Sequence, residues 1–228
     1  MSARMKRSVA AALAVLVLAG CGPTADSPRG PADSSADTSG PRALLASWHA
    51  SLASGDKPPY LGCFVGSKDE LVLALAAFEV VQASYAFHNA VVAAYGPEGW
   101  KAFEESDGIR VGLLPRDPAW AQTITVMRMG PAAFGYLPRG RVPLAMSEAG
   151  GRWRLHASGL VPPGLEARRA ADYLFRWAAT LRELVPGIGD GQIKADRARR
   201  DVAERFQSRV APAEQPAAAE AVDYFMMY

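Results

Sequence analysis

The sequence of 228 residues carries 25 lysine and arginine side chains against 23 aspartate and glutamate side chains, a formal charge of +2 at neutral pH. Three of the positive charges lie within the first seven residues, so the rest of the chain is close to neutral. This balance argues against nucleic acid as a partner, because nucleic-acid-binding domains usually present a net basic surface. The sequence also lacks the cysteine and histidine spacings of zinc sites and the glycine-rich motifs of nucleotide sites. It therefore predicts neither a metal site nor a cofactor.

The first predicted element is a targeting segment. Three basic residues, Arg4, Lys6 and Arg7, precede a run without charges from Ser8 to Ala19. A bilayer-spanning helix needs about 20 apolar residues, so this shorter run fits the apolar region of a signal peptide. Residues 1–20 are therefore predicted to be a signal peptide.

The apolar run ends in Leu18-Ala-Gly-Cys21, which resembles the lipobox of bacterial lipoproteins. The resemblance implies cleavage before Cys21, acylation of its thiol and of the new N-terminus, and a permanent membrane anchor. The following Gly22 resembles the default signal for outer-membrane sorting in Gram-negative bacteria. The alternative is an ordinary signal peptide with an incidental cysteine. If Cys21 carries lipid, Cys63 has no internal disulfide partner, and its apolar setting predicts a buried structural thiol.

The remaining layout follows from composition. Residues 22–40 contain almost no large apolar side chain, so they cannot bury enough surface to offset ordering entropy. We therefore predict a disordered tether over 21–41, one domain over 42–210 and a flexible tail over 211–228. The large apolar residues of Val222–Tyr228 are expected to dock onto their own domain or onto a partner.

Helical spacing of apolar residues predicts a first helix over Ala43–Ala53. Gly55 follows this helix, and Pro58-Pro59 argue against an immediate second helix.

A long helix is predicted from Lys68 to Tyr95. Ser67 and Glu70 have the spacing of a capping box at its start, and the helix is apolar on nearly all sides, which is typical of a central, buried helix. Gly96-Pro97 end it. A third, short helix is predicted over Pro97–Glu105.

Alternating apolar residues then predict strands, separated in several places by glycine-containing turns. The five predicted strands span Ile109–Leu114, Ala121–Met129, Ala132–Leu137, Val142–Ser147 and Arg152–Ala157. Two helices are predicted after the sheet, one with an apolar stripe from Leu165 to Leu184 and one over Gly191–Arg209.

Three helices followed by an antiparallel sheet resemble the NTF2-like superfamily, also known as SnoaL-like or cystatin-like cone proteins. Trp48, Leu52 and Gly55-Asp56 are similar to the first helix and Gly-Asp turn of that family, and Glu148–Leu155 is similar to its final hairpin. The resemblance implies an α+β fold in which N-terminal helices pack on a curved antiparallel sheet and enclose a pocket. The two C-terminal helices are additions to this cone.

For catalytic members, the resemblance implies an acid/base Asp, His or Tyr inside the cone. His88 is the best candidate, with Tyr85 as the second, because His88 lies one helical turn after Ser84 and Tyr85 and these side chains can approach one another. The alternative is a helix histidine that bonds to a neighbour or is partly exposed near the helix end. The predicted strands contain no Asp or Glu apart from Glu148 near a turn, which argues against an enzyme. The candidate ligand-binding residues are Gln82, Ser84 and Trp100.

These features predict a lipoprotein of the bacterial cell envelope, on the periplasmic side of the outer membrane if the organism is Gram-negative. Lipid on Cys21 is the expected contact with the membrane. The expected role is non-catalytic, either binding of a small apolar ligand or interaction with an envelope protein. The alternative is a small-molecule enzyme of the isomerase, dehydratase or hydrolase type that uses His88 in its pocket.

Overall fold

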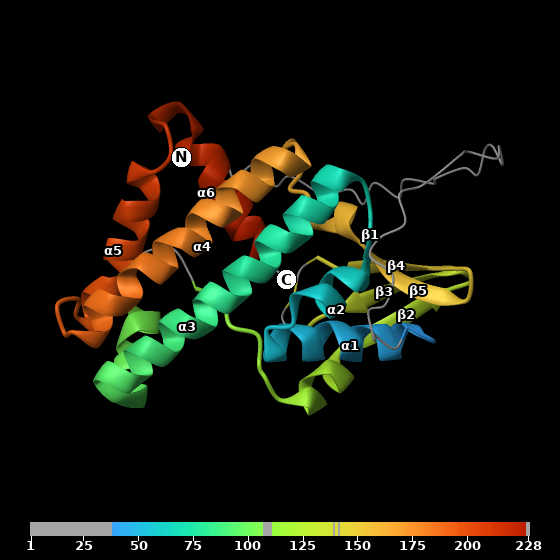
Figure 1. Ribbon diagram of the computed structural model, residues 1–228, viewed down its shortest axis with the longest axis horizontal. Helices are drawn as coiled ribbons and strands as arrows, with labels where there is room; N and C mark the ends of the chain where they lie inside the picture. The colour runs from blue at the N-terminus through green and yellow to red at the C-terminus, as the bar shows by residue number, and fades with distance from the viewer. Residues whose placement is uncertain (1–37, 107–110, 139, 141, 227–228) are drawn as a thin grey trace, which may run out of the picture. The chain divides into compact units, whose positions relative to one another are not determined.

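The computed structural model describes residues 38–106, 111–138, 140 and 142–226 of the protein. The predicted signal peptide, Cys21 and most of the predicted tether lie outside this part. The described residues all belong to one unit, Pro31–Tyr228. The fold is α+β, as predicted, with a five-stranded sheet and helices both before and after it (Figure 1).

The sheet has the strand order β1-β5-β4-β3-β2. An antiparallel meander runs through β2 (Thr125–Met129), β3 (Ala132–Tyr136), β4 (Leu144–Ala149) and β5 (Arg152–His156). The short strand β1 (Phe64–Val65) pairs with β5 in parallel. The sheet is therefore mixed, and the prediction of a purely antiparallel sheet is wrong. A strand of two residues is too short to show any alternation in its sequence.

Glycines close the two tight hairpins of the meander. Gly130 has a φ of 60° between β2 and β3, and Gly150 and Gly151 have φ values of 61° and 74° between β4 and β5. Residues other than glycine rarely adopt this left-handed backbone conformation. The conformation matches the twist of two-residue hairpin turns, so glycine is favoured at these positions. The predicted hairpins at these turns are confirmed.

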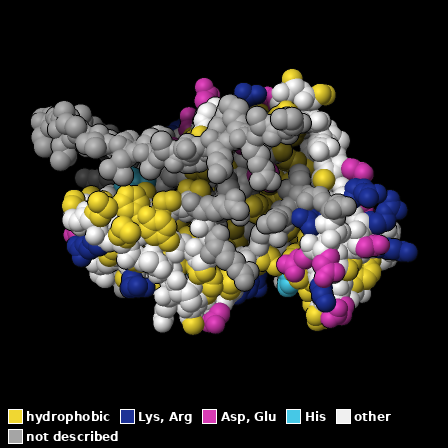
Figure 2. Space-filling view, turned by 180° about the vertical axis from the view of Figure 1, so that it is seen from behind, with side chains coloured by type: hydrophobic (Ala, Val, Ile, Leu, Met, Phe, Trp, Pro, Cys, Tyr) yellow, Lys and Arg dark blue, Asp and Glu magenta, His cyan; other side chains and the backbone are white. Residues whose placement is uncertain are grey.

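The sheet has a buried inner face and an exposed outer face. Leu144 and Met146 of β4 and Trp153 and Leu155 of β5 are buried on the inner face. The outer face includes four large apolar side chains that are more than a third exposed: Val65, Met127, Met129 and Tyr136. Figure 2, which views the molecule from behind, shows hydrophobic side chains gathered over the part where the sheet lies.

Helix α1 (Pro41–Ser54) ends at Gly55 as predicted, but a second helix follows at once. This helix, α2 (Lys57–Gly62), contradicts the expectation that Pro58-Pro59 exclude one. Both prolines lie in its first turn, where the backbone N–H groups have no intrahelical acceptor and their loss costs nothing. The proline pair therefore starts a helix here.

Helix α3 (Lys68–Glu105) is the central helix, as predicted, and packs chiefly against α4 (Ala167–Gly189). The predicted capping box between Ser67 and Glu70 is present. Gly96, with a φ of 73°, interrupts the helical backbone, so the predicted break is real even though the helix resumes at once. Among the described helices, α3 alone is long and apolar enough to cross a membrane. Most of its apolar stretch is buried inside the domain, as in the core helix of a globular fold.

The helix order after the sheet differs from the prediction. Helices α4 and α5 (Ala195–Ser208) were expected, but a third helix, α6 (Gln215–Phe225), lies in the predicted flexible tail. Ala218, Ala221 and Val222 are buried, and α6 packs on α4. The described fold therefore continues past residue 210. Small side chains allow this close packing, and they also made the segment look like a linker.

The predicted strand Ile109–Leu114 is wrong in the part that can be described. Val111 to Leu114 form no strand, and they lead into the 3-10 helix η1 (Pro118–Thr123). The next predicted strand, Ala121–Met129, begins only at Thr125, because η1 occupies its first residues. The strands predicted over 132–137, 142–147 and 152–157 correspond to β3, β4 and β5, with β4 shifted toward the C-terminus.

Glu79 joins three helices through ion pairs. Its carboxylate on α3 binds Lys57 of α2 at 2.7 Å and also binds Arg182 of α4. Partial burial raises the pKa of Glu79, but the hydrogen bonds from Lys57 and Arg182 outweigh this effect and lower the pKa overall. The ionised form of this carboxylate is therefore more favoured in the folded state than in the unfolded state.

Because the folded pKa of Glu79 is lowered, its contribution to stability is present above the usual glutamate pKa and is lost as the pH falls below it. Replacing Glu79→Gln is expected to make the free energy of unfolding less dependent on pH in that acidic range. The effect is expected to be about 1 kcal/mol or less, because both basic partners are half exposed. Urea unfolding at a series of pH values measures it. Identical pH profiles for the two proteins would contradict the ion pairs.

Candidate ligand-binding site

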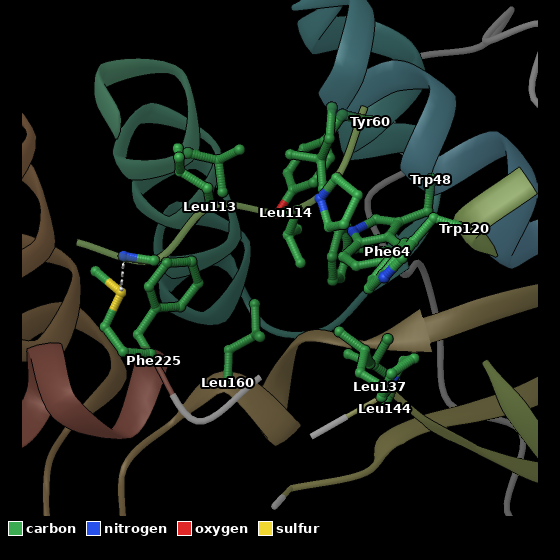
Figure 3. Close-up of a pocket in the computed structure, with 16 residues that line it drawn as sticks. Trp48, Tyr60, Phe64, Leu113, Leu114, Trp120, Leu137, Leu144, Leu160 and Phe225 are labelled. Carbon is green, nitrogen blue, oxygen red and sulfur yellow. Dashed lines mark hydrogen bonds between the residues drawn. The ribbon is translucent and has the colours of Figure 1, made fainter. Parts of the chain in front are cut away.

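A cavity of about 380 Å³ lies between the first helices and the inner face of the sheet. The helical side contributes Trp48 and Leu52 of α1, Tyr60 of α2 and Val81 of α3. Trp48 and Leu52 recur at i and i+4 on α1, so they face the sheet together. Figure 3 shows Trp48 and Tyr60 reaching into the site from these two helices.

The sheet side of the cavity is also apolar. Phe64 of β1 and Leu144 of β4 line it, together with Leu137 just after β3 and Leu160 of the 3-10 helix η2 (Ala157–Leu160). Figure 3 shows Leu137 and Leu144 side by side, opposite the aromatic side chains of α1 and α2. Leu144 belongs to the buried set of residues that alternates along β4, so the period-two pattern of this strand supplies part of the wall.

A third wall is the segment 112–115, which two hydrogen bonds hold in place. The hydroxyl of Tyr85 donates to the carbonyl of Leu114 at 2.9 Å, and His49 Nε2 lies 2.6 Å from the carbonyl of Pro115. A carbonyl only accepts hydrogen bonds, so His49 Nε2 carries a proton. His49 is 2 % exposed and packs against Trp120, which also lines the cavity. Its role in positioning this wall was not predicted.

The C-terminal helix closes one side of the cavity. Phe225 and Met226 at the end of α6 both line it. The backbone N–H of Gly112 donates to the sulfur of Met226 at 3.3 Å, and the hydroxyl of Tyr224 donates to the carbonyl of Gly159 at 3.1 Å. Figure 3 shows the Gly112–Met226 contact beside Phe225. The described part of the apolar terminus, up to Met226, therefore docks onto its own domain, one of the two alternatives that the sequence left open.

Tyr60 and Trp48 bring polar groups into this apolar site. Tyr60 is 2 % exposed, and burial strongly raises the pKa of its hydroxyl, while the neighbouring indole N–H of Trp48 acts in the opposite direction. Trp48 Nε1 is buried, and its contact with the Tyr60 hydroxyl falls short of full hydrogen-bond geometry, so no described residue fully satisfies this donor. Tyr60 is therefore protonated at any physiological pH, and both side chains are neutral hydrogen-bond donors.

The residues predicted for catalysis do not meet in the cavity. His88 is not part of its lining; its ring packs edge-on against Trp100 at 4.6 Å, and its Nδ1 lies 3.3 Å from Asn89 Oδ1. Tyr85 uses its hydroxyl to hold the wall at Leu114. Ser84 is fully buried, and its Oγ has no hydrogen-bond partner within the described ranges. His88 thus fits the alternative of a partly exposed helix histidine that contacts its neighbours.

The predicted ligand-binding residues also lie elsewhere. Gln82 donates to the carbonyl of Leu52 at 2.7 Å and so ties α3 to α1. Trp100 stacks on Phe103 beyond the break at Gly96. Neither residue lines the cavity, and neither does Ser84. The prediction placed the site on polar positions of α3, whereas α3 contributes only Val81 to the lining.

Cys63 is a buried thiol, as predicted from its setting. It is completely inaccessible, and its Sγ donates to the carbonyl of Pro59 at 3.3 Å. Burial raises the pKa of this thiol to about 12, although Arg154 opposes the shift. The thiolate is the reactive form of cysteine, so Cys63 is inert at neutral pH. Cys21 lies outside the described residues.

Comparison of the chain with known proteins found no relative. No family model, curated protein or solved structure matches the chain. Among the described residues, no group of three or more His, Cys, Asp or Glu side chains is arranged to hold a metal ion.

Proposed function

We propose that this protein is a lipid-anchored binding protein of the bacterial cell envelope, and that it holds a small, largely apolar ligand in the cavity between α1, α2 and the sheet. The cavity carries the proposal. Its volume of about 380 Å³ falls in the range of small-molecule sites, which are typically concave, mostly apolar and supplied with few polar groups. Burial of an apolar ligand there is favourable at roughly 25 cal/mol for each Å² removed from water.

The proposed anchor is Cys21 in Leu18-Ala-Gly-Cys21, which lies outside the described residues. The start of the described chain supports a tethered arrangement. The carbonyl of Thr38 accepts a hydrogen bond from the Trp153 backbone N–H at 2.8 Å, and Arg154 donates to the Thr38 hydroxyl at 3.1 Å. The segment that leads from the proposed lipid therefore joins the domain at the edge of β5.

We also propose a distant relation to the NTF2-like superfamily. A pocket between N-terminal helices and the inner face of a sheet supports this relation. Three features depart from the expected order: the extra helix α2, the parallel strand β1 and three helices after the sheet. The C-terminal additions narrow the cavity, because Phe225 and Met226 form part of its lining.

Interaction with an envelope protein is a second candidate, favoured by the exposed outer face of the sheet. Met127 and Met129 on β2 are 51 % and 61 % exposed, and large exposed apolar patches often mark protein contacts. The enzyme alternative has less support, because His88 lies outside the cavity.

Binding of a neutral fluorescent apolar dye, N-phenylnaphthylamine, tests the cavity. The purified domain is expected to enhance the dye's fluorescence in a saturable way. Leu160→Trp adds bulk at a lining position and is expected to weaken dye binding about tenfold or more, because overpacking of this kind costs about 1–3 kcal/mol. Leu165→Trp is the matched control, since Leu165 is partly buried against the core and does not line the cavity.

His88→Ala and Met127→Glu are expected to leave dye binding unchanged. Equal dye binding by the Leu160 and Leu165 variants would contradict the cavity as the site. Complementation of a deletion strain at equal protein levels then separates the candidate roles. Failure of Leu160→Trp alone supports ligand binding, failure of Met127→Glu alone supports protein interaction, and failure of His88→Ala alone would favour the enzyme.

A further inference from the structure

The cavity contains a pair of hydrogen-bond donors on neighbouring elements. Trp48 comes from α1 and Tyr60 from α2, and these helices pack against each other. Both side chains line the cavity, and each is at most 6 % exposed. In Figure 3 the Tyr60 ring extends from α2 toward Leu114, with its hydroxyl oxygen at the inner tip.

The Trp48 donor is at most weakly satisfied in the protein itself. Its indole N–H acts on the Tyr60 hydroxyl as a hydrogen-bond donor that lowers the pKa of that group, but the contact falls short of full hydrogen-bond geometry, and no other described residue accepts from this N–H. A buried polar group without a partner is unfavourable, and native proteins rarely keep one without a reason. An indole N–H can only donate, so the missing partner is a hydrogen-bond acceptor.

The rest of the described lining is neutral. It consists of apolar side chains, the neutral indole of Trp120 and glycine or proline backbone, without an Asp, Glu, Lys, Arg or His. Arg116 packs over the ring of Tyr85 at 4.1 Å and does not line the cavity. The thiol of Cys63 and the hydroxyl of Tyr60 both stay protonated, because burial raises their pKa values. An ionised ligand would therefore lose its hydration without gaining an opposite charge from these residues.

We infer that the ligand is a neutral, mainly apolar molecule with one hydrogen-bond acceptor, such as a carbonyl oxygen, which receives hydrogen bonds from Trp48 Nε1–H and the Tyr60 hydroxyl. This inference rests on the proposed function, because it assigns the chemical class of ligand for the same cavity. The donor pair fixes the orientation of the ligand, and the apolar walls supply most of the contact.

Three straight-chain molecules with the same number of heavy atoms test the inference: undecane, methyl octyl ketone and nonanoate. Each competes with N-phenylnaphthylamine for the purified domain. Once each affinity is divided by the molecule's partition coefficient from water into hexadecane, the ketone is expected to bind about tenfold more tightly than the alkane, the ratio that corresponds to a net hydrogen-bond gain at the upper end of the usual range. Nonanoate at neutral pH is expected to bind most weakly.

Two conservative variants remove one donor each. Trp48→Phe and Tyr60→Phe are each expected to reduce the preference for ketone over alkane several-fold. Tyr95→Phe is the matched control. It also removes a tyrosine hydroxyl, but that hydroxyl donates to the carbonyl of Ile193, between α3 and the segment before α5. Thermal melts confirm that each variant is folded, and either donor variant alone is sufficient for the test.

The outcomes distinguish a wrong ligand class from the absence of a binding site. If the dye and undecane bind but the ketone has no advantage, or if its advantage survives in both donor variants, the inference fails and the apolar site stands. Tightest binding of nonanoate would overturn the neutral class of ligand. If neither the dye nor any probe binds, the proposed function fails, and the inference fails with it.

Discussion

Replacing Trp153→Ala is expected to lower the free energy of unfolding by about 3–5 kcal/mol, as for other buried large aromatic residues. Trp153 is 2 % exposed and is one of the largest fully buried side chains. It lies on the inner face of β5, opposite Glu148 of β4, and the guanidinium of Arg128 lies 5.1 Å from its ring. Alanine would leave a void where the last hairpin covers the core. Urea denaturation followed by circular dichroism measures the change.

A loss of this size approaches the whole stability of many domains, so the variant is expected to accumulate poorly or to be unfolded at physiological temperature. Trp153→Phe keeps an aromatic ring and provides a folded intermediate case. Trp100→Ala is the control for loss of an indole, because Trp100 is only partly buried and its replacement is expected to cost less. A cost below about 1 kcal/mol for Trp153→Ala would show that β5 does not contribute this side chain to the core.

Elements with a strong local pattern could be predicted from the sequence. Helix α3 combines a capping box at Ser67 and Glu70 with apolar residues on nearly all sides, and both features survive in the structure. The β4–β5 hairpin combines alternating residues with Gly150-Gly151, which supply the positive φ values of the turn. In these segments, local chemistry and tertiary packing favour the same conformation.

Elements whose local pattern is ambiguous were missed. Pro58-Pro59 indicate a helix break in general, yet they are compatible with the first turn of a helix, and α2 uses them there. The sequence around Ala217–Ala219 has the composition of a linker, but α6 buries small side chains against α4. Its helical state depends on that tertiary contact, which a single sequence does not display.

The cavity could not be predicted from the sequence because each lining residue, considered alone, is an ordinary apolar side chain. Leu52, Leu137 and Leu160 come from α1, the end of β3 and η2, and only the fold brings them to one cavity. Sequence reasoning favoured His88 because a polar residue on an apolar helix is conspicuous. Trp48 was recognised as part of the resemblance to the NTF2-like family, but the buried, poorly satisfied indole N–H on which its proposed binding role rests depends on its three-dimensional neighbours.

The anchor is the proposal with the largest expected effect in cells. Replacing Cys21→Ser is expected to abolish incorporation of a fatty acid and to move the protein from the membrane fraction to the soluble fraction. Each acyl CH₂ that is buried in the membrane contributes about 0.8 kcal/mol, so several acyl chains together hold a protein there permanently. Without lipid, the tether has almost no large apolar side chain that could insert into the membrane. Metabolic labelling with a fatty acid, combined with fractionation, measures both effects.

Cys63→Ser is the matched control, because it makes the same substitution at a buried thiol that hydrogen-bonds within the fold. This variant is expected to remain labelled and in the membrane fraction. Label that persists in Cys21→Ser would exclude Cys21 as the modified residue. A wild-type protein that is cleaved but carries no label would instead favour the ordinary signal peptide. In that case the protein would be released from the membrane and would bind its ligand while diffusing freely. The cavity would be unchanged, since none of its described lining residues lies in the segment that carries the proposed anchor.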